Sequence, residues 1–342
     1  MHIPQAERDG GTLGGAGQRD TATASVAICA YTMVRWENLV NAVASILRQL
    51  GPADDCLVVI DHNEELRSRA EAEFGAHASV RVVASSGPRG LSGARNTAIA
   101  LTRGDILAFL DDDAVAGDLW LDRMRAALAD PEVFAGGSAA LPHWPESGRP
   151  TWFPPEFDWV VGCSYVGLPD VRTDVRNVIG AAMAFRREAF ELAGVFSTVV
   201  GRIGTAPTGC EETELCIRLR RARPTARVTY LPDIAVTHHV TPERLSLRYF
   251  FRRCMGEGLS KARVSRLVGA GDGLASERTY VLSTLPRGVG RGLRRGLRGD
   301  LAGFSTSALI IAGTFVTACA YLRGRLARSE RRSARVHEAS VS

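Results

Sequence analysis

Between residues 25 and 130 the chain alternates short apolar runs with longer segments in which apolar residues recur every three or four positions. Short runs rich in branched residues predict buried strands, and the longer spacing predicts amphipathic helices. The predicted strands are 26–30, 56–60, 80–84 and 106–111, and the predicted helices are 36–50, 64–74, 93–102 and 119–129. Strands alternating with such helices indicate right-handed βαβ units. The pattern therefore predicts an α/β fold with a mainly parallel sheet flanked by helices.

After residue 130 the pattern loosens, and it resumes near residue 178. Residues 141–176 hold many prolines and several large aromatic residues. Loops of this length are usually functional, so we expect this one to cover the functional face, the alternative being an insertion without a role. The later predicted elements are a strand at 178–185, helices at 187–193, 211–222 and 243–268, short strands at 228–231 and 235–237, and a glycine-rich loop at 201–209.

Composition and charge divide the chain into three regions. Residues 1–24 are rich in glycine, threonine, alanine and charge, which predicts disorder. Residues 25–240 form the α/β domain, and residues 241–342 form a helical, basic C-terminal region. The formal charge of +5 arises mainly from arginines beyond residue 287. Such an asymmetry fits an anionic membrane surface better than nucleic acid, so no nucleic-acid partner is expected.

The C-terminal region contains a charge-free stretch, 302–322, with arginines on both sides. Its length suits a spanning helix, although it is only weakly apolar. Flanking arginines on both sides give no orientation, and they fit an interfacial helix equally well. A packed soluble helix pair is the third possibility. No apolar leader is visible and the seven cysteines lack metal-binding spacing, so we expect the cytoplasmic face of the membrane, or otherwise the cytoplasm.

Three consecutive carboxylates, Asp111, Asp112 and Asp113, follow the apolar run at 106–110. Ligands in open α/β sheets bind at the carboxyl ends of strands, where these residues are predicted to lie. Carboxylate oxygens suit Mg²⁺ or Mn²⁺, and such an ion would also contact substrate phosphates. If the strand stays extended, Asp111 and Asp113 lie on one side and Asp112, then a structural residue, on the other. The alternative is a solvated acidic turn before a helix.

Polar residues also follow the first and second predicted strands, at Tyr31 and Asp61. Because the ends of parallel strands share one edge, these residues should meet the aspartates along one crevice. Asp61 could accept hydrogen bonds from a base or ribose. Neither a GxGxxG sequence after the first strand nor a Walker A sequence is present, which disfavours dinucleotide and P-loop folds.

Several segments resemble family-2 glycosyltransferases, which belong to the nucleotide-diphospho-sugar transferase superfamily and have a GT-A fold. The matching parts are 25–31, Asp61, 90–96, 109–113, 180–190, 194–196 and 211–219. They follow the family's order and spacing over about residues 25–240. The resemblance implies a hexosyltransferase-like enzyme that uses a nucleotide-sugar donor. The segment 31–36 also resembles enzymes that glycosylate dolichyl-phosphate-linked sugars.

The resemblance assigns roles at the donor site. Asp113 is the implied metal ligand, with Asp111 at the metal or ribose. The other implied donor contacts are Tyr31, Asp61, Arg95, Asn96 and Asp112, although Arg95 and Asn96 could equally serve helix packing or a surface ion pair. His238 is an implied metal or phosphate contact, with a structural role as the alternative. The implied cofactor is a divalent cation, Mg²⁺ or Mn²⁺.

The resemblance also places an acidic pair, here Glu211 and Glu212, at the start of the helix after the variable loop. Glu212 occupies the general-base position, where the family has aspartate. A base there would take the proton of an acceptor hydroxyl, and one direct displacement would invert the anomeric configuration. The acceptor is expected to be a glycan, a small molecule, or a lipid-linked or cell-envelope glycan. The alternatives are a sugar-1-phosphate nucleotidyltransferase and an inactive binding protein of the same fold.

Overall fold

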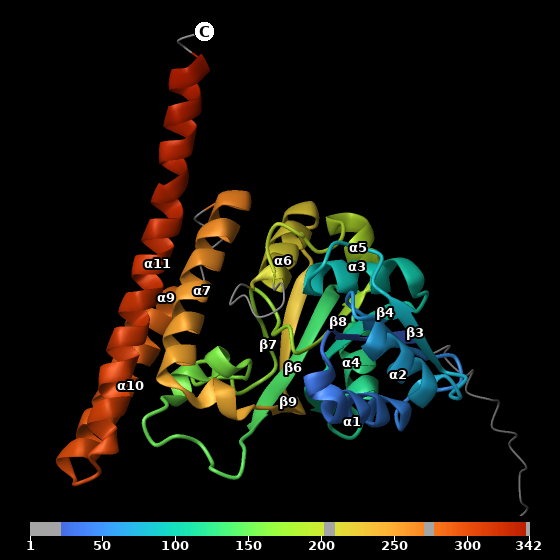
Figure 1. Ribbon diagram of the computed structural model, residues 1–342, viewed down its shortest axis with the longest axis horizontal. Helices are drawn as coiled ribbons and strands as arrows, with labels where there is room; N and C mark the ends of the chain where they lie inside the picture. Colours follow the sequence, from blue (N-terminus) through green and yellow to red (C-terminus); the bar gives the residue numbers. More distant parts are fainter. Residues whose placement is uncertain (1–21, 202–208, 270–276, 340–342) are drawn as a thin grey trace, which may run out of the picture.

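A mixed nine-stranded sheet forms the centre of the computed structural model, which describes residues 22–201, 209–269 and 277–339 (Figure 1). The strands are β1 (Ala24–Ala30), β2 (Asp55–Ile60), β3 (Val80–Ala84), β4 (Ile106–Asp111), β5 (Ala114–Ala116), β6 (Val133–His143), β7 (Thr173–Asp174), β8 (Ala182–Arg186) and β9 (Arg227–His239). Their order is β3-β2-β1-β4-β8-β6-β9-β5, with β7 beside β9. The first four are parallel as predicted, and β8 is antiparallel to both β4 and β6.

Helices cover both faces of this sheet. The α-helices are α1 (Trp36–Leu47), α2 (Glu64–Phe74), α3 (Leu91–Leu101), α4 (Trp120–Leu128), α5 (Arg187–Ala193), α6 (Glu211–Ala222), α7 (Leu247–Leu267), α9 (Glu277–Thr279), α10 (Leu285–Leu297) and α11 (Ala302–Ala339). Short 3₁₀ helices are η1 (Met33–Arg35), η2 (Pro155–Val161) and η3 (Pro242–Leu245), and η4 (Tyr280–Thr284) is a π-helical turn. One core lies between the sheet and α1, α2 and α4, and a second between the sheet and α3, α5 and α6.

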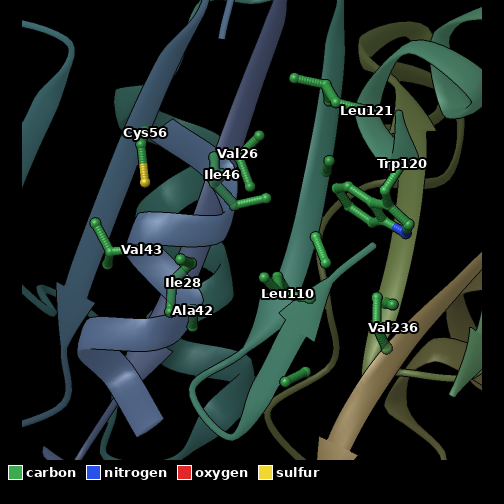
Figure 2. Close-up of a cluster of buried hydrophobic side chains, with 14 of the residues drawn as sticks. Val26, Ile28, Ala42, Val43, Ile46, Cys56, Leu110, Trp120, Leu121 and Val236 are labelled. Carbon is green, nitrogen blue, oxygen red and sulfur yellow. The ribbon is translucent and has the colours of Figure 1, made fainter. Parts of the chain in front are cut away.

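In the first core, the spacing of apolar residues along α1 places their side chains against the sheet. Val43 and Ile46, three residues apart on α1, turn toward Val26 and Ile28 of β1 (Figure 2). All four side chains are fully buried. Burying one such side chain contributes about 1.5–3 kcal/mol relative to leaving it exposed. This packing fixes the strands whose carboxyl ends carry the polar residues.

Several predicted elements differ from the structure. The strand β6, predicted as irregular chain, is buried between β8 and β9, and its run Gly136–Gly137–Ser138 lacks the branched residues that signal a strand. The two short strands predicted near 228–237 are one strand, β9, whose register shifts opposite Ser138 and Ala139. The helix predicted at 243–268 is interrupted at Ser246, whose hydroxyl caps α7. The predicted strand at 178–185 starts only at Ala182.

At the N-terminus, β1 begins at Ala24, within the segment predicted to be disordered, whereas residues 1–21 lie outside the described residues. The glycine-rich loop predicted at 201–209 also lies mostly outside them. The predicted loop 141–176 contains η2 and β7. Its aromatic residues pack with α7, α10 and α11 in a third core around Phe157, Phe250 and Ile310.

The C-terminal helices stand beside the sheet domain, with α11 running along α7 (Figure 1). The two helices approach closely at Gly258, where an added Cβ would lie 2.8 Å from the Cβ of Ala320. Among the described residues, Ala302–Leu326 of α11 is the one helical segment long and apolar enough to cross a membrane. Of its most apolar 18-residue window, 28% is buried within the protein.

Candidate active site

The carboxyl end of β4 brings together Asp111, Asp113 and His238. Strand β5 follows the aspartates and pairs with β9, so that Ala114 lies opposite His238. The backbone N–H of His239 donates to the carbonyl of Asp113 over 2.7 Å. As a result, one possible ligand atom from each of the three side chains lies within 4.8 Å of the others.

Asp113 is nearly fully buried and is surrounded by cations. Its carboxylate lies 3.2 Å from Nε2 of His238, 2.8 Å from Nη2 of Arg244 and 3.2 Å from Nη1 of Arg35. Burial alone would raise the pKa of this carboxyl, but these three neighbours hold the pKa well below its usual value. Burial would likewise lower the pKa of His238, and the Asp113 carboxylate instead raises it to about 10.

Asp112 lies outside the group formed by Asp111, Asp113 and His238 and pairs with Arg35 instead. Strand β4 ends at Asp111, so the next two residues form a turn, and Asp112 and Asp113 share the guanidinium of Arg35. Burial raises the pKa of Asp112 to about 6 even though Arg35 opposes the shift. Asp111 and Asp113 thus lie together and Asp112 lies apart from them, as the sequence predicted, and Arg35 links Asp112 to Asp113.

The sequence assigned no role to Arg35 or Arg244, although both contact the cluster. Arg244 is 6% exposed and also donates to the carbonyl of Val161 over 3.0 Å. Arg35 follows β1 within the short segment 31–36, and its guanidinium lies 5.7 Å from the ring centroid of Tyr31. For Arg35, the only signal in the sequence was its place in the segment 31–36 after the first predicted strand. Nothing in the sequence indicated that Arg244 belongs to the site.

Arg95 and Glu211 form a second buried cluster next to Asp111. Nη1 of Arg95 lies 2.9 Å from Glu211, and its Nη2 lies 3.4 Å from Asp111 and donates to the carbonyl of Gly180 over 2.8 Å. Arg95 is 2% exposed and Glu211 is 4% exposed. One carboxylate oxygen of Glu211 has no hydrogen-bond partner among the described residues. Arg95 thus joins the predicted acidic pair to the end of β4.

Glu212 lies against the same cluster. A Cβ added to Gly180 would lie 3.4 Å from Nη2 of Arg95 and 3.7 Å from Oε2 of Glu212. Burial, and then the charge of Glu211, raises the pKa of Glu212 to about 8. The helix carrying both acids begins after Cys210, whose φ of 72° is unusual for a residue with a side chain. Such conformations cluster at functional sites.

The remaining predicted site residues lie along the same edge of the sheet. Asp61, at the end of β2, accepts a hydrogen bond from the backbone N–H of Gly90 over 2.9 Å and contacts Nδ1 of His62. The half-buried Tyr31 follows β1. Asn96 instead uses its side-chain amide to bond both the N–H and the carbonyl of Phe196, each over 2.9 Å. Those contacts hold the Phe196 loop.

The donor set at Asp111, Asp113 and His238 fits a divalent cation. Carboxylate oxygens suit Mg²⁺ and Mn²⁺, and imidazole is a common additional ligand in its neutral form, so an ion bound here would displace the proton that His238 otherwise carries. The three groups come from the end of β4, the turn between β4 and β5, and β9, and they lie close enough to share one ion. Arg244 holds Asp113 in place by a hydrogen bond and Arg35 does so by an ion pair, as outer partners of metal ligands usually do.

Residues 25–193 match the sequence profile described as Glycosyl transferase family 2. A glucosyl-dolichyl phosphate glucuronosyltransferase of Haloferax volcanii is 32% identical over 238 residues, which cover 69% of this chain and 75% of that protein. A pre-mycofactocin glycosyltransferase of Mycobacterium tuberculosis is 26% identical over 69% of this chain, but this match spans only 48% of the mycobacterial protein.

The fold has solved counterparts. A mannosyltransferase from Pyrobaculum calidifontis, in complex with GDP-Man and Mn²⁺, aligns over 89% of this chain and 86% of that one, with a TM-score of 0.53 and 19% identity. The mixed sheet with flanking helices is therefore of the GT-A type, as the sequence predicted.

Proposed function

The chain belongs to glycosyl transferase family 2 and is a glycosyltransferase, and from this premise we propose that it moves a sugar from a nucleotide-diphosphate donor to an acceptor hydroxyl with inversion. One observation carries the proposal. The cluster of Asp111, Asp113 and His238 lies at the carboxyl edge of the sheet, where the half-buried Glu212 also lies. A site for a metal-bound diphosphate thus adjoins a carboxylate that can accept a proton.

We assign the divalent cation to Asp111, Asp113 and His238. A bound cation there would act as a Lewis acid and neutralise the diphosphate leaving group. Asp113 keeps its charge and orientation through Arg35 and Arg244. We place Tyr31 and Asp61 at the nucleoside, because they follow β1, which pairs with β4, and β2, the next strand in the sheet. Arg95 and Asn96 have their side chains engaged within the protein and serve as supports of the site.

Glu212 is the proposed general base. With a pKa of about 8, it holds a proton at neutral pH in much of the free enzyme and ionises as the pH rises. An ionised Glu212 can take the proton of the acceptor hydroxyl as that oxygen attacks the anomeric carbon. A base with a pKa near the working pH is effective in this role. Glu211 is paired with Arg95, so it orients the site.

A lipid-linked acceptor is the finer part of the proposal. The Haloferax relative is named for a dolichyl phosphate-linked sugar, and α11 offers an apolar surface. We further propose that α11 lies in the membrane interface and does not span the bilayer. Its inner side packs on α7, which carries Arg252, Arg253 and Lys261, and a spanning α11 would draw these charges into lipid.

Donor turnover tests the function. Purified protein would be incubated with a panel of nucleotide sugars and Mn²⁺ or Mg²⁺, with nucleoside diphosphate release as the readout. We expect one donor to turn over, and we expect Asp113→Asn and Glu212→Gln to abolish turnover while Asp118→Asn, an exposed neighbour, does not. Metal-dependent donor binding without turnover of any donor would favour the inactive binding protein. Release of pyrophosphate from a nucleoside triphosphate and a sugar phosphate would favour the nucleotidyltransferase.

Vesicle flotation tests the membrane assignment. Leu297 and Phe315 are 81% and 68% exposed on α10 and α11. Changing both to aspartate should release the protein from vesicles containing anionic lipid, whereas Val171→Asp, at a site also 68% exposed but on the sheet domain, should not. Equal flotation of all variants would overturn the interfacial placement.

A further inference from the structure

An open cavity of about 640 Å³ lies between α10 and the edge of the sheet formed by β6 and β9. Its polar lining includes Ser164, Tyr165 and Tyr230 from the sheet side and Arg287 and Arg291 from α10. This volume is within the range of small-ligand sites, about 300–1,000 Å³. None of the residues assigned above to the donor, the metal or the base lines it.

The cavity borders the metal cluster. Leu141 lines the cavity, and the next residue, Pro142, pairs with His238 across the β6–β9 ladder. On the other side, Ser164 follows Gly162 by two residues. A Cβ on Gly162 would lie 3.2 Å from the His238 ring. A molecule bound in the cavity would therefore lie next to the site that holds the donor diphosphate.

The rim of the cavity offers an exposed arginine to an anion. Arg287 is exposed along its rim, and Arg291 pairs with Glu156, whose second oxygen is buried without a hydrogen-bond partner among the described residues. Asp158, the acid lining the interior, is paired with Arg149, and burial raises its pKa to about 7. Asp170 is the other lining acid and is exposed. The fork of Arg287 suits a phosphate group, which accepts paired N–H bonds, and Arg291, beside Glu156, lies one turn further along the same helix.

The helix that supplies these arginines also carries exposed apolar side chains. Leu293 and Leu297 of α10 are 44% and 81% exposed, and Leu301, just before α11, is 73% exposed. Between them lie Arg294 and Arg295. Apolar residues interleaved with arginines are the pattern of a helix that lies at an anionic lipid surface. The phosphate-binding side of α10 and its lipid-facing side therefore adjoin.

We propose that this cavity binds the phosphate ester at the head of a lipid-linked acceptor. Arg287 and Arg291 hold the phosphate, the sugar fills the cavity toward His238, and the lipid chain leaves over the apolar residues of α10. This assignment rests on the proposed function, because it gives the acceptor of the same reaction its binding site. Tyr165 and Tyr230 supply flat surfaces and hydroxyls that suit a sugar ring.

Binding of soluble probes tests the site. Geranyl phosphate, geraniol and inorganic phosphate would be titrated into the full chain by calorimetry. Geranyl phosphate should bind at least about tenfold more tightly than either of the others, a difference of about 1.4 kcal/mol. If inorganic phosphate binds as tightly as geranyl phosphate, the cavity is a site for free anions only. If geraniol binds as tightly as geranyl phosphate, the arginines do not contribute to binding. Either result overturns the proposal.

Variants locate the site. Arg287→Gln should weaken geranyl phosphate binding about tenfold and raise the KM for a polyprenyl-phosphate-linked acceptor, while Arg298→Gln, on the same helix outside the cavity, should change neither. Because Arg291 neutralises Glu156, it would be tested as the double variant Arg291→Gln with Glu156→Gln. A thermal shift by Mn²⁺ and nucleotide equal to that of the unaltered protein would show that each variant is folded.

Unchanged geranyl phosphate binding and unchanged KM in both cavity variants would refute the assignment of the cavity as the acceptor site. Donor turnover in the absence of acceptor separates this failure from a failure of the proposed function, because turnover depends on the metal cluster and not on α10.

Discussion

Replacing Arg95 with methionine tests how far the buried ion pairs hold the site together. The change removes the 2.9 Å pair with Glu211, the 3.4 Å contact with Asp111 and the hydrogen bond to Gly180. Glu211 is 4% exposed and would lose the cation that neutralises it. Removing one partner of a buried pair costs about 3–5 kcal/mol, because it leaves an uncompensated charge. Methionine keeps an apolar stem near Phe109, so little packing energy is lost.

The measurement is equilibrium unfolding in urea, in which a change of midpoint at constant slope reports stability. We expect Arg95→Met to lower the free energy of unfolding by about 3–5 kcal/mol, and adding Glu211→Gln to restore much of that loss, because the second change removes the stranded charge. Arg123→Met is the matched control. Its pair with Asp233 is 3.7 Å long and exposed, so it should cost at most about 1 kcal/mol.

Two results would refute this reasoning. One is an Arg95→Met variant no less stable than Arg123→Met, which would mean that the buried pairs contribute little. The other is a double variant as unstable as the single one, which would place the cost in lost packing and not in the charge of Glu211.

Further outcomes follow from the same geometry. The raised pKa of Glu212 predicts that kcat/KM increases as the pH rises through about 8, since the base must lose its proton. The Glu212→Gln variant should not show this increase. A kcat/KM that falls as the pH rises would contradict the role of Glu212 as the base. His238→Ala should weaken Mn²⁺ affinity at least about tenfold by titration, and unchanged affinity would remove it from the metal set. Gly258→Val should separate α7 from α11, because a Cβ there meets Ala320 at 2.8 Å. Faster proteolysis of the C-terminal helices would report the separation, and an unchanged rate would argue against close packing.

The sequence predicted the N-terminal half of the sheet well because its signals are local. Branched apolar runs give β2 and β3, and in α2 the side chain of Asn63 accepts from the N–H of Leu66 and so marks the first turn. Strand β6 was missed because its buried surface is made by Gly136, Gly137 and neighbouring small residues, and it depends on contacts with β8 and β9 that no local pattern encodes.

The residues of the candidate site divide in the same way, into those that a local pattern indicates and those that depend on contacts between distant parts of the chain. The strand-end residues Asp61, Asp111 and Asp113 were found because the topology of a parallel sheet brings strand ends together. Arg244 could not be found in this way, because it reaches Asp113 from 131 residues away along the chain, through the packing of η3 on η2. The sequence placed Asp112 apart from Asp111 and Asp113, but its pairing with Arg35 depends on a contact between residues 77 positions apart, which no local pattern indicates.

Calorimetric titration of Mn²⁺, in the presence of the nucleoside diphosphate product of the active donor, tests the central claim most directly. A ligand cluster at Asp111, Asp113 and His238 predicts saturable binding of about one ion per chain, lost in Asp113→Asn and kept in the exposed control Asp118→Asn. Equal binding by the Asp113→Asn variant would contradict the account, because the ion would then lie elsewhere.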